Sequence, residues 1–251
     1  MTVFAHQLRA EQLIFWRNRE SAVFVFIFPV LLFVLLGSLY DGEITIGNVD
    51  YPASDVLLAG MIGYGAANTA FAGLAISLVL RREYGILKRL RATPLPAVTY
   101  LGAVLTSSLI VFSLQVLTLF ALGRLAYDAA LPDRIGSLLL LVVLGVVAFA
   151  GLGIGSAALI RSGEGASAVL NVILLPMAFL SGAFGSRDYP AVLEAIANVL
   201  PLKYFIDLVY AVYLEREPIW DDPLAIAVVS AWGIGGAIVG ARRFGWEPRE
   251  R

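Results

Sequence analysis

Six long apolar runs constrain this chain more than any other feature of its sequence. A helix needs roughly 20 apolar residues to cross the ~30 Å hydrocarbon core of a bilayer. Lipid offers no hydrogen-bonding partner to the backbone, so a spanning run of this kind must be helical. The runs of about this length cover residues 22–40, 56–80, 98–123, 136–160, 166–185 and 224–241. The sequence therefore predicts an all-α integral membrane protein with six transmembrane helices.

The composition of the chain agrees with a membrane protein. Hydrophobic residues make up 59% of its 251 residues, and charged residues only 15%. Soluble domains carry about 25% charged residues. The chain therefore has too little polar surface for a water-soluble globule.

Most side chains that carry out catalysis are missing. There is no cysteine, which excludes disulfides, thiolate metal sites and cysteine nucleophiles. The one histidine, His6, precedes the first apolar run, so a Ser-His hydrolase would lack its base. No GxxxxGK[ST] motif is present, and Gly151, Gly153 and Gly155 lie inside a predicted span, where they indicate close helix packing. We expect no catalytic residue, no metal site and no cofactor in this chain.

The predicted spans contain no ionisable residue. Proton- and ion-coupled transporters ordinarily place a carboxylate in a span, so a transporter of this kind would take its energy from elsewhere. Among the uncharged polar residues of the spans, Asn68 and Asn171 are the costliest to bury. They are candidates for lining a pathway, and packing between helices explains them equally well.

The basic residues are distributed unequally between the two sides of the membrane. With six spans, the residues before 22, 81–97, 161–165 and those after 241 share one side. That side holds 13 basic and six acidic residues, a net charge of +7, whereas the other side has a net charge of −8. Cytoplasmic loops carry the excess of Lys and Arg. We therefore expect a multi-pass protein of the cell (inner or plasma) membrane with both termini in the cytoplasm.

The segment 3–19, which precedes the first span, has the pattern of an amphipathic helix. Phe4, Leu8 and Phe15 share one helical face, and the charged residues lie elsewhere. Such a helix would lie along the cytoplasmic membrane interface. A cytoplasmic extension of the first span explains the pattern equally well.

The segment 186–214, which follows the fifth span, is too polar to span and too apolar for a solvated loop. Pro201 interrupts its helical pattern. We expect two short re-entrant helices in the outer membrane face, broken between Leu200 and Pro201, and the alternative is one amphipathic loop helix.

A dense basic stretch, LRREYGILKRLRATPLP, follows the second span. Its spacing predicts one amphipathic helix over 81–92, with Glu83 and Leu87 on the apolar face and the basic residues opposite. The prolines of TPLP end this helix. The stretch could serve only to fix topology, but an acid on an apolar face is costly unless a partner satisfies it. The pattern therefore favours a helix that docks on another protein.

This stretch resembles the signature of the permeases of the ABC-2 type ABC transporter family. Ile86 departs from the family pattern, which more often has threonine there. The LSGAFG motif that ends at Gly185 and the LPLKYFIDLVY motif at 200–210 are also similar to family features. The residues that match the signature are Glu83, Gly85, Leu87, Arg89, Leu90, Arg91, Ala92, Thr93, Pro94 and Leu95.

The resemblance covers essentially the whole chain and implies one ABC-2 transmembrane domain over 1–251. It implies a dimer with a second permease copy or a paralogue, and two copies of a separate P-loop ATPase subunit that hold ATP and Mg. Segment 81–92 would be the cytoplasmic coupling helix, with a second contact near 161–164. The implied ATPase-coupling residues are Arg81, Arg82, Glu83, Gly85, Lys88, Arg89, Arg91, Thr93, Pro94, Arg161 and Glu164. The pathway would lie at the dimer interface, lined mainly by the first, second and fifth spans and closed by the outer re-entrant helices, with Asn68, Thr69, Asn171, Met177 and Phe179 as lining residues.

The expected function is therefore that of a permease subunit in an ATP-driven exporter. It would move a hydrophobic or amphipathic drug, antibiotic or lipid outward by alternating access, because the polar residues of its spans are uncharged. The alternatives are a polysaccharide or glycolipid exporter and a membrane scaffold that transports nothing. The missing His and Cys disfavour an enzyme that acts on lipid. Besides the ATPase and the second permease, membrane lipid is the expected partner, and nucleic acid is not.

Overall fold

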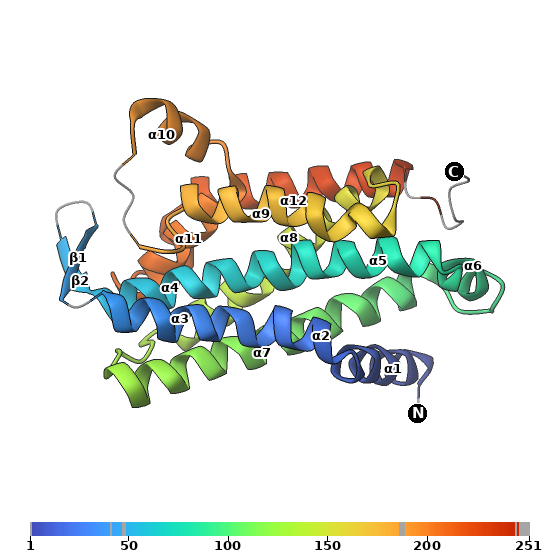
Figure 1. Ribbon diagram of the computed structural model, residues 1–251, viewed down its shortest axis with the longest axis horizontal. Helices are drawn as coiled ribbons and strands as arrows, with labels where there is room; N and C mark the ends of the chain where they lie inside the picture. The colour runs from blue at the N-terminus through green and yellow to red at the C-terminus, as the bar shows by residue number, and fades with distance from the viewer. Residues whose placement is uncertain (1, 41, 47–48, 186–188, 244, 246–251) are drawn as a thin grey trace.

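The protein is almost entirely helical (Figure 1). The computed structural model describes residues 2–40, 42–46, 49–185, 189–243 and 245. The first half of the chain forms α1 (Val3–Arg17), α2 (Arg19–Ala22), η1 (Val23–Ile27), α3 (Phe28–Leu39), β1 (Glu43–Ile46), β2 (Val49–Pro52), α4 (Ala53–Ala66), η2 (Ala67–Gly73), α5 (Leu74–Glu83) and α6 (Ile86–Arg91). The second half forms α7 (Ala97–Tyr127), α8 (Ile135–Leu159), α9 (Gly163–Leu180), α10 (Ala191–Ala197), α11 (Pro201–Tyr213), η3 (Ile219–Asp221) and α12 (Pro223–Arg243).

The predicted all-α membrane fold is confirmed. Within the described residues, five continuous helices are long and apolar enough to cross a membrane: Ala53–Glu83, which joins α4, η2 and α5, and the helices α7, α8, α9 and α12. The first predicted span corresponds to a shorter apolar helix, Val23–Leu39. The second is longer than the predicted 56–80, so that Asp55 lies in its first turn. The Asp55 carboxylate is buried there and accepts hydrogen bonds from the Ala130 N–H and the Tyr213 hydroxyl.

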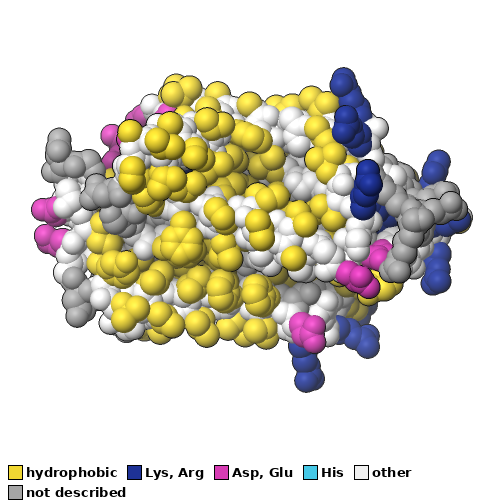
Figure 2. All heavy atoms as spheres, turned by 45° about the horizontal axis from the view of Figure 1, so that its top comes forward, with side chains coloured by type: hydrophobic (Ala, Val, Ile, Leu, Met, Phe, Trp, Pro, Cys, Tyr) yellow, Lys and Arg dark blue, Asp and Glu magenta, His cyan; other side chains and the backbone are white. Residues whose placement is uncertain are grey.

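The two ends of the helical bundle differ in charge. α1, α6 and the last turn of α12 lie at one end, where lysine and arginine side chains gather (Figures 1 and 2). We call this the basic end. The β1–β2 hairpin, with Glu43 and Asp50, lies toward the opposite end, as does α10 (Figure 1). An apolar belt separates the two ends (Figure 2), as expected for a protein that spans a membrane.

The glycines of α8 pack against other helices, as predicted. A Cβ atom on Gly151 would lie 2.2 Å from the carbonyl oxygen of Gly233, and one on Gly155 would lie 2.6 Å from that of Gly236. A Cβ on Gly153 would lie 2.8 Å from the Phe71 oxygen. These small residues therefore allow the backbone of α8 to pack directly against the backbones of α12 and η2.

Segment 81–92 is not one helix, which corrects the prediction. The second span continues to Glu83, and Gly85 then adopts a left-handed conformation with φ 68°. A second, short helix, α6, begins at Ile86. Glycine reaches this conformation without steric cost, so the chain changes direction in the middle of the basic stretch.

The two other amphipathic segments form separate helices. α1 ends at Arg17, and Asn18 leaves the helical conformation with ψ 85°, so α1 is not a continuous extension of the first span. α10 and α11 meet at an angle of 83° before Pro201, which agrees with two short helices rather than one. Residues 186–188 of that prediction lie outside the described residues.

Candidate functional site

The basic stretch after the second span divides into two parts at Gly85. Arg81, Arg82 and Glu83 form the last turn of α5, and each makes polar contacts with a different part of the chain. Lys88, Arg89 and Arg91 lie on α6 and are exposed. We call the first three the anchor triplet and the last three the α6 cations.

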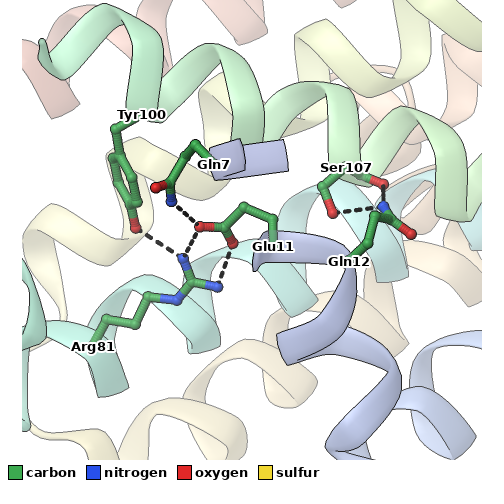
Figure 3. A network of polar contacts seen from close by, with 6 residues as sticks. All are labelled: Gln7, Glu11, Gln12, Arg81, Tyr100 and Ser107. Carbon is green, nitrogen blue, oxygen red and sulfur yellow. Dashed lines mark hydrogen bonds and ion pairs between the residues drawn. The ribbon is translucent and has the colours of Figure 1, made fainter. Parts of the chain in front are cut away.

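Arg81 connects the second span to the N-terminal helix (Figure 3). Its guanidinium group donates to both carboxylate oxygens of Glu11, at 3.0 and 2.7 Å, and to the Tyr100 hydroxyl at 2.9 Å. The Gln7 amide donates to the same carboxylate at 2.8 Å. Only 3% of the Glu11 side chain and 13% of the Arg81 side chain are exposed. This buried, two-point ion pair therefore fixes α1 against α5 and α7.

A second polar contact holds α1 on α7. The side-chain amide of Gln12 donates to the hydroxyl of Ser107 at 2.8 Å and to its carbonyl oxygen at 3.2 Å (Figure 3). Ser107 is buried in the middle of α7. α1 is thus attached to α7 through Gln12 as well as to α5 through Glu11.

Arg82 lies inside the protein, although the sequence pattern predicts it on the exposed basic face. It is 1% exposed. Its guanidinium group donates to the carbonyl oxygens of Ala157 at 2.9 Å and Ile160 at 2.5 Å. These carbonyls end α8, where the helix has no further N–H groups to satisfy them and where a cation is favourable.

Glu83 has a partner within the chain. Its Oε2 accepts a hydrogen bond of 2.6 Å from the N–H of Gly163, the first residue of α9. The preceding Ser162 makes no side-chain cap of α9. The prediction that the acid needs a partner is therefore met by α9, and the loop before α9, with Arg161 and Glu164 beside it, lies against α5.

The α6 cations face outward. Leu87, on the opposite face of α6, is fully buried, and it holds the helix on the protein. Within the described part of the chain, Lys88, Arg89 and Arg91 form no ion pair with an acid. The Thr93 hydroxyl donates to the Leu90 carbonyl at 2.6 Å, and the helix ends there before Pro94.

The polar residues predicted to line a pathway divide between the interior and the surface. Asn68 and Thr69 are buried in η2, a π-helical turn that packs on the π-helical turn η1. The Asn68 amide donates to the carbonyls of Phe24 at 3.2 Å and Val25 at 3.4 Å, and the buried Gln115 amide donates to Val25 at 3.1 Å. Thr69 donates to Gln115 at 3.4 Å. The geometry supports the packing explanation for Asn68 and Thr69.

Three predicted lining residues lie on α9, and one of them opens onto a groove. Asn171 donates to Ser167 of its own helix, and Met177 is buried. Phe179 is 60% exposed. It borders a groove of about 430 Å³ between α3 and α9, lined by Phe28, Leu32, Leu36, Tyr40, Leu175, Phe179, Phe184 and Tyr189. We call this the aromatic groove.

Comparison with known proteins places the chain in a family. The model of the ABC-2 type transporter family matches residues 2–214, which include α1, both parts of the basic stretch and the aromatic groove. The chain belongs to this family. It is also similar to the protein named "Putative transport permease YvfS" from Bacillus subtilis (strain 168), with 24% identity over 231 residues that cover 90% of this chain and 91% of the relative.

As an ABC-2 family member, the chain is the transmembrane permease subunit of a transporter and a multi-pass membrane protein. Such permeases are generally not catalytic, and they pair with an ATPase subunit. In this permease, the basic stretch therefore contains two kinds of residue, the anchor triplet, which binds groups on other helices, and the α6 cations, which are exposed and form no ion pair within the described part of the chain.

Several residues of the site were not predicted from the sequence. Glu11 and Tyr100, which surround Arg81, lie 70 and 19 residues from it in the chain. The only indication that Glu11 belongs to the site was its charge, on the amphipathic helix α1. Residues 28, 32, 36 and 40 form the α3 side of the aromatic groove. Their four-residue spacing was the indication in the sequence that they share one face of a helix.

Proposed function

We propose that this permease is the membrane subunit of an ATP-driven exporter that moves a hydrophobic or amphipathic molecule, such as a drug, an antibiotic or a lipid, out of the cell. The observation that carries the proposal is the exposed basic helix α6, which is seated on the protein by Leu87 at the end of the second span. Energy supplied by another protein would enter there.

The partner is a separate P-loop ATPase, present in two copies, which binds ATP and Mg. Its docking surface would be acidic, because it would face Lys88, Arg89 and Arg91 and the exposed Arg161 of the neighbouring loop. Thr93 and Pro94 end α6 and so fix its length. The basic end is cytoplasmic in this proposal, with both termini on that side of the plasma membrane.

The aromatic groove is the proposed substrate pathway. It is open on the protein surface between α3 and α9, and a second permease copy or a paralogue would close it. Its lining offers few polar groups to a substrate, which favours an apolar or amphipathic molecule or a membrane lipid. ATP-driven closure of the two ATPase subunits would move α6 and α5 and switch the groove between inward and outward access.

The composition of the groove also favours a second candidate, the export of a polysaccharide or glycolipid. Five of its eight lining residues are aromatic, namely Phe28, Tyr40, Phe179, Phe184 and Tyr189. Aromatic rings present flat apolar faces on which the C–H faces of sugar rings can pack. Phe179 is the most exposed of the residues that line the groove.

Copurification and ATP hydrolysis test the proposal. We would coexpress the permease with a P-loop ATPase encoded beside it, reconstitute the complex in liposomes, and measure hydrolysis with a panel of drugs, lipids and glycolipids. The variant Lys88→Glu/Arg89→Glu should lose the ATPase, since it reverses the charge of the docking surface. Phe179→Ala should keep the ATPase and lose stimulation by substrate.

The outcomes separate the candidates. Stimulation by glycolipids alone would favour the second candidate. A complex that copurifies but is stimulated by no substrate and transports none would indicate a scaffold. If the charge-reversed variant copurifies and hydrolyses ATP as the unaltered permease does, α6 is not the docking element and the proposal is wrong.

A further inference from the structure

The anchor triplet connects both ends of one short loop to the second span. Arg82 binds the carbonyls that end α8, and Glu83 binds the first N–H of α9. Only residues 160–162 separate these two helices. The loop between α8 and α9 is therefore held at both ends by adjacent side chains of a single turn of α5.

We propose that Glu83 and Arg82 act inside the permease, as positioning residues that fix the start of α9 to the second span, and not as contacts to the ATPase. This inference rests on the proposed function, because it assigns two residues of the basic stretch to the path between α6 and the aromatic groove. Arg82 is 1% exposed and has no surface to offer a partner. Glu83 is exposed, but its Oε2 already accepts the hydrogen bond from Gly163.

The charges suit this role. The C-terminal end of a helix carries a partial negative charge and the N-terminal end a partial positive charge. The guanidinium of Arg82 lies at the first kind of end, and the carboxylate of Glu83 at the second. Each contact is a hydrogen bond to a charged group, which is stronger than one between neutral groups.

Gly163 shows how closely the two elements meet. A Cβ atom at this position would lie 2.0 Å from Glu83 Oε2 and 2.9 Å from Leu80 Cδ2. Any side chain at residue 163 would therefore displace the Glu83 carboxylate. Because Ser162 supplies no side-chain cap, the first N–H of α9 depends on Glu83 among the side chains that the structure describes there.

The consequence concerns the movement of α9. α6 is joined to α5 by two residues, Tyr84 and Gly85, so a force on α6 reaches the end of the second span. The Glu83 contact passes that movement to α9, whose residues Leu175 and Phe179 form one wall of the aromatic groove. Without the contact, α6 would still bind the ATPase and move with it, but α9 would not follow that movement.

The first experiment uses the full permease–ATPase complex in liposomes. Glu83→Ala and Gly163→Ala should copurify with the ATPase at the unaltered level, and both should lower substrate stimulation of hydrolysis about tenfold, since each removes a charge-assisted hydrogen bond. Glu83→Gln should restore much of the stimulation, because its amide oxygen can still accept from Gly163. The double variant Glu83→Ala/Gly163→Ala should be no worse than the worse single variant, since both changes act on one contact.

The second experiment uses the permease alone and does not depend on its function. The chain has no cysteine, so spin labels can be placed at Arg91→Cys and Arg161→Cys, two exposed positions on either side of the contact. The label distance should broaden in Glu83→Ala and in Gly163→Ala, and should stay narrow in the control Lys88→Ala.

The outcomes of the two experiments distinguish a positioning role of Glu83 from a docking role. Loss of the ATPase in Glu83→Ala, as in Lys88→Glu/Arg89→Glu, would make Glu83 a docking residue and overturn the inference. An unchanged label distance in both variants would overturn it as well. A third outcome combines the two experiments. If the label distance broadens in Glu83→Ala and Gly163→Ala, and Lys88→Glu/Arg89→Glu still binds the ATPase, the positioning role is supported and the proposed docking surface is contradicted.

Discussion

The anchor triplet and the α6 cations belong to one basic stretch, yet they make different contacts. Arg81, Arg82 and Glu83 contact four other helices, whereas Lys88, Arg89 and Arg91 contact solvent. Both groups contain arginine, and only residues 84–87 separate them. Position relative to the left-handed Gly85, rather than charge, decides whether a residue of this stretch stabilises the permease or is free to bind a partner.

The largest effect that would test this comparison is expected for Glu11→Ala. The change leaves the Arg81 guanidinium largely buried without its counterion, which costs on the order of 3 kcal/mol. We expect a lower yield of folded protein and a lower free energy of unfolding in mixed micelles. The double variant Glu11→Ala/Arg81→Ala should cost less than the sum of the two single changes, and additive effects would contradict a coupled pair.

A matched pair of arginine substitutions gives the next effect. Arg82→Ala leaves two carbonyls at the end of α8 unsatisfied and should cost about 2 kcal/mol of stability. Arg89→Ala removes an exposed cation and should stay within about 0.5 kcal/mol of the unaltered protein. Thermal unfolding in detergent measures both. Equal unfolding temperatures would show that the two halves of the stretch do not differ as described.

An effect on stability smaller than that of Arg82→Ala is expected where the two halves meet. A Cβ atom at residue 85 would touch nothing within 4 Å, so Gly85→Ala would cost only the left-handed backbone conformation, about 1 kcal/mol. The strain should move α6 relative to α5 and weaken ATPase binding more than stability. Gly165→Ala, at a glycine with equally open surroundings and no left-handed conformation, is the control. If the two variants bind the ATPase equally, the direction of α6 does not depend on Gly85.

The sequence predicted the elements of this fold better than their contacts. Apolar length located the helices, and Pro94 and Pro96 located the end of α6, because both signals are local. The break at Gly85 was not predicted, although a glycine after a helix often adopts the left-handed conformation. The apolar residues keep a period of 3.6 residues across Gly85, and this pattern favoured one continuous helix.

The contacts of the site depend on residues far apart in the chain. Nothing near Arg81 indicates that its partner is Glu11, and nothing near Glu83 indicates Gly163. Asn68 was recognised as an unusual residue for a membrane span. Its role could not be predicted, because the carbonyls that it satisfies are made available by a π-helical turn in another span.

That π-helical turn also determines which way the aromatic groove faces. A π-helical turn holds one more residue than an α-helical turn, and each residue of an α-helix adds about 100° of rotation. If η1 rewound as an ordinary α-helix, the α3 wall of the groove, from Phe28 to Tyr40, would swing by about 100° relative to α2. Asn68 and Gln115, which hold the carbonyl of Val25, therefore set the rotational position of a whole span with two neutral side chains.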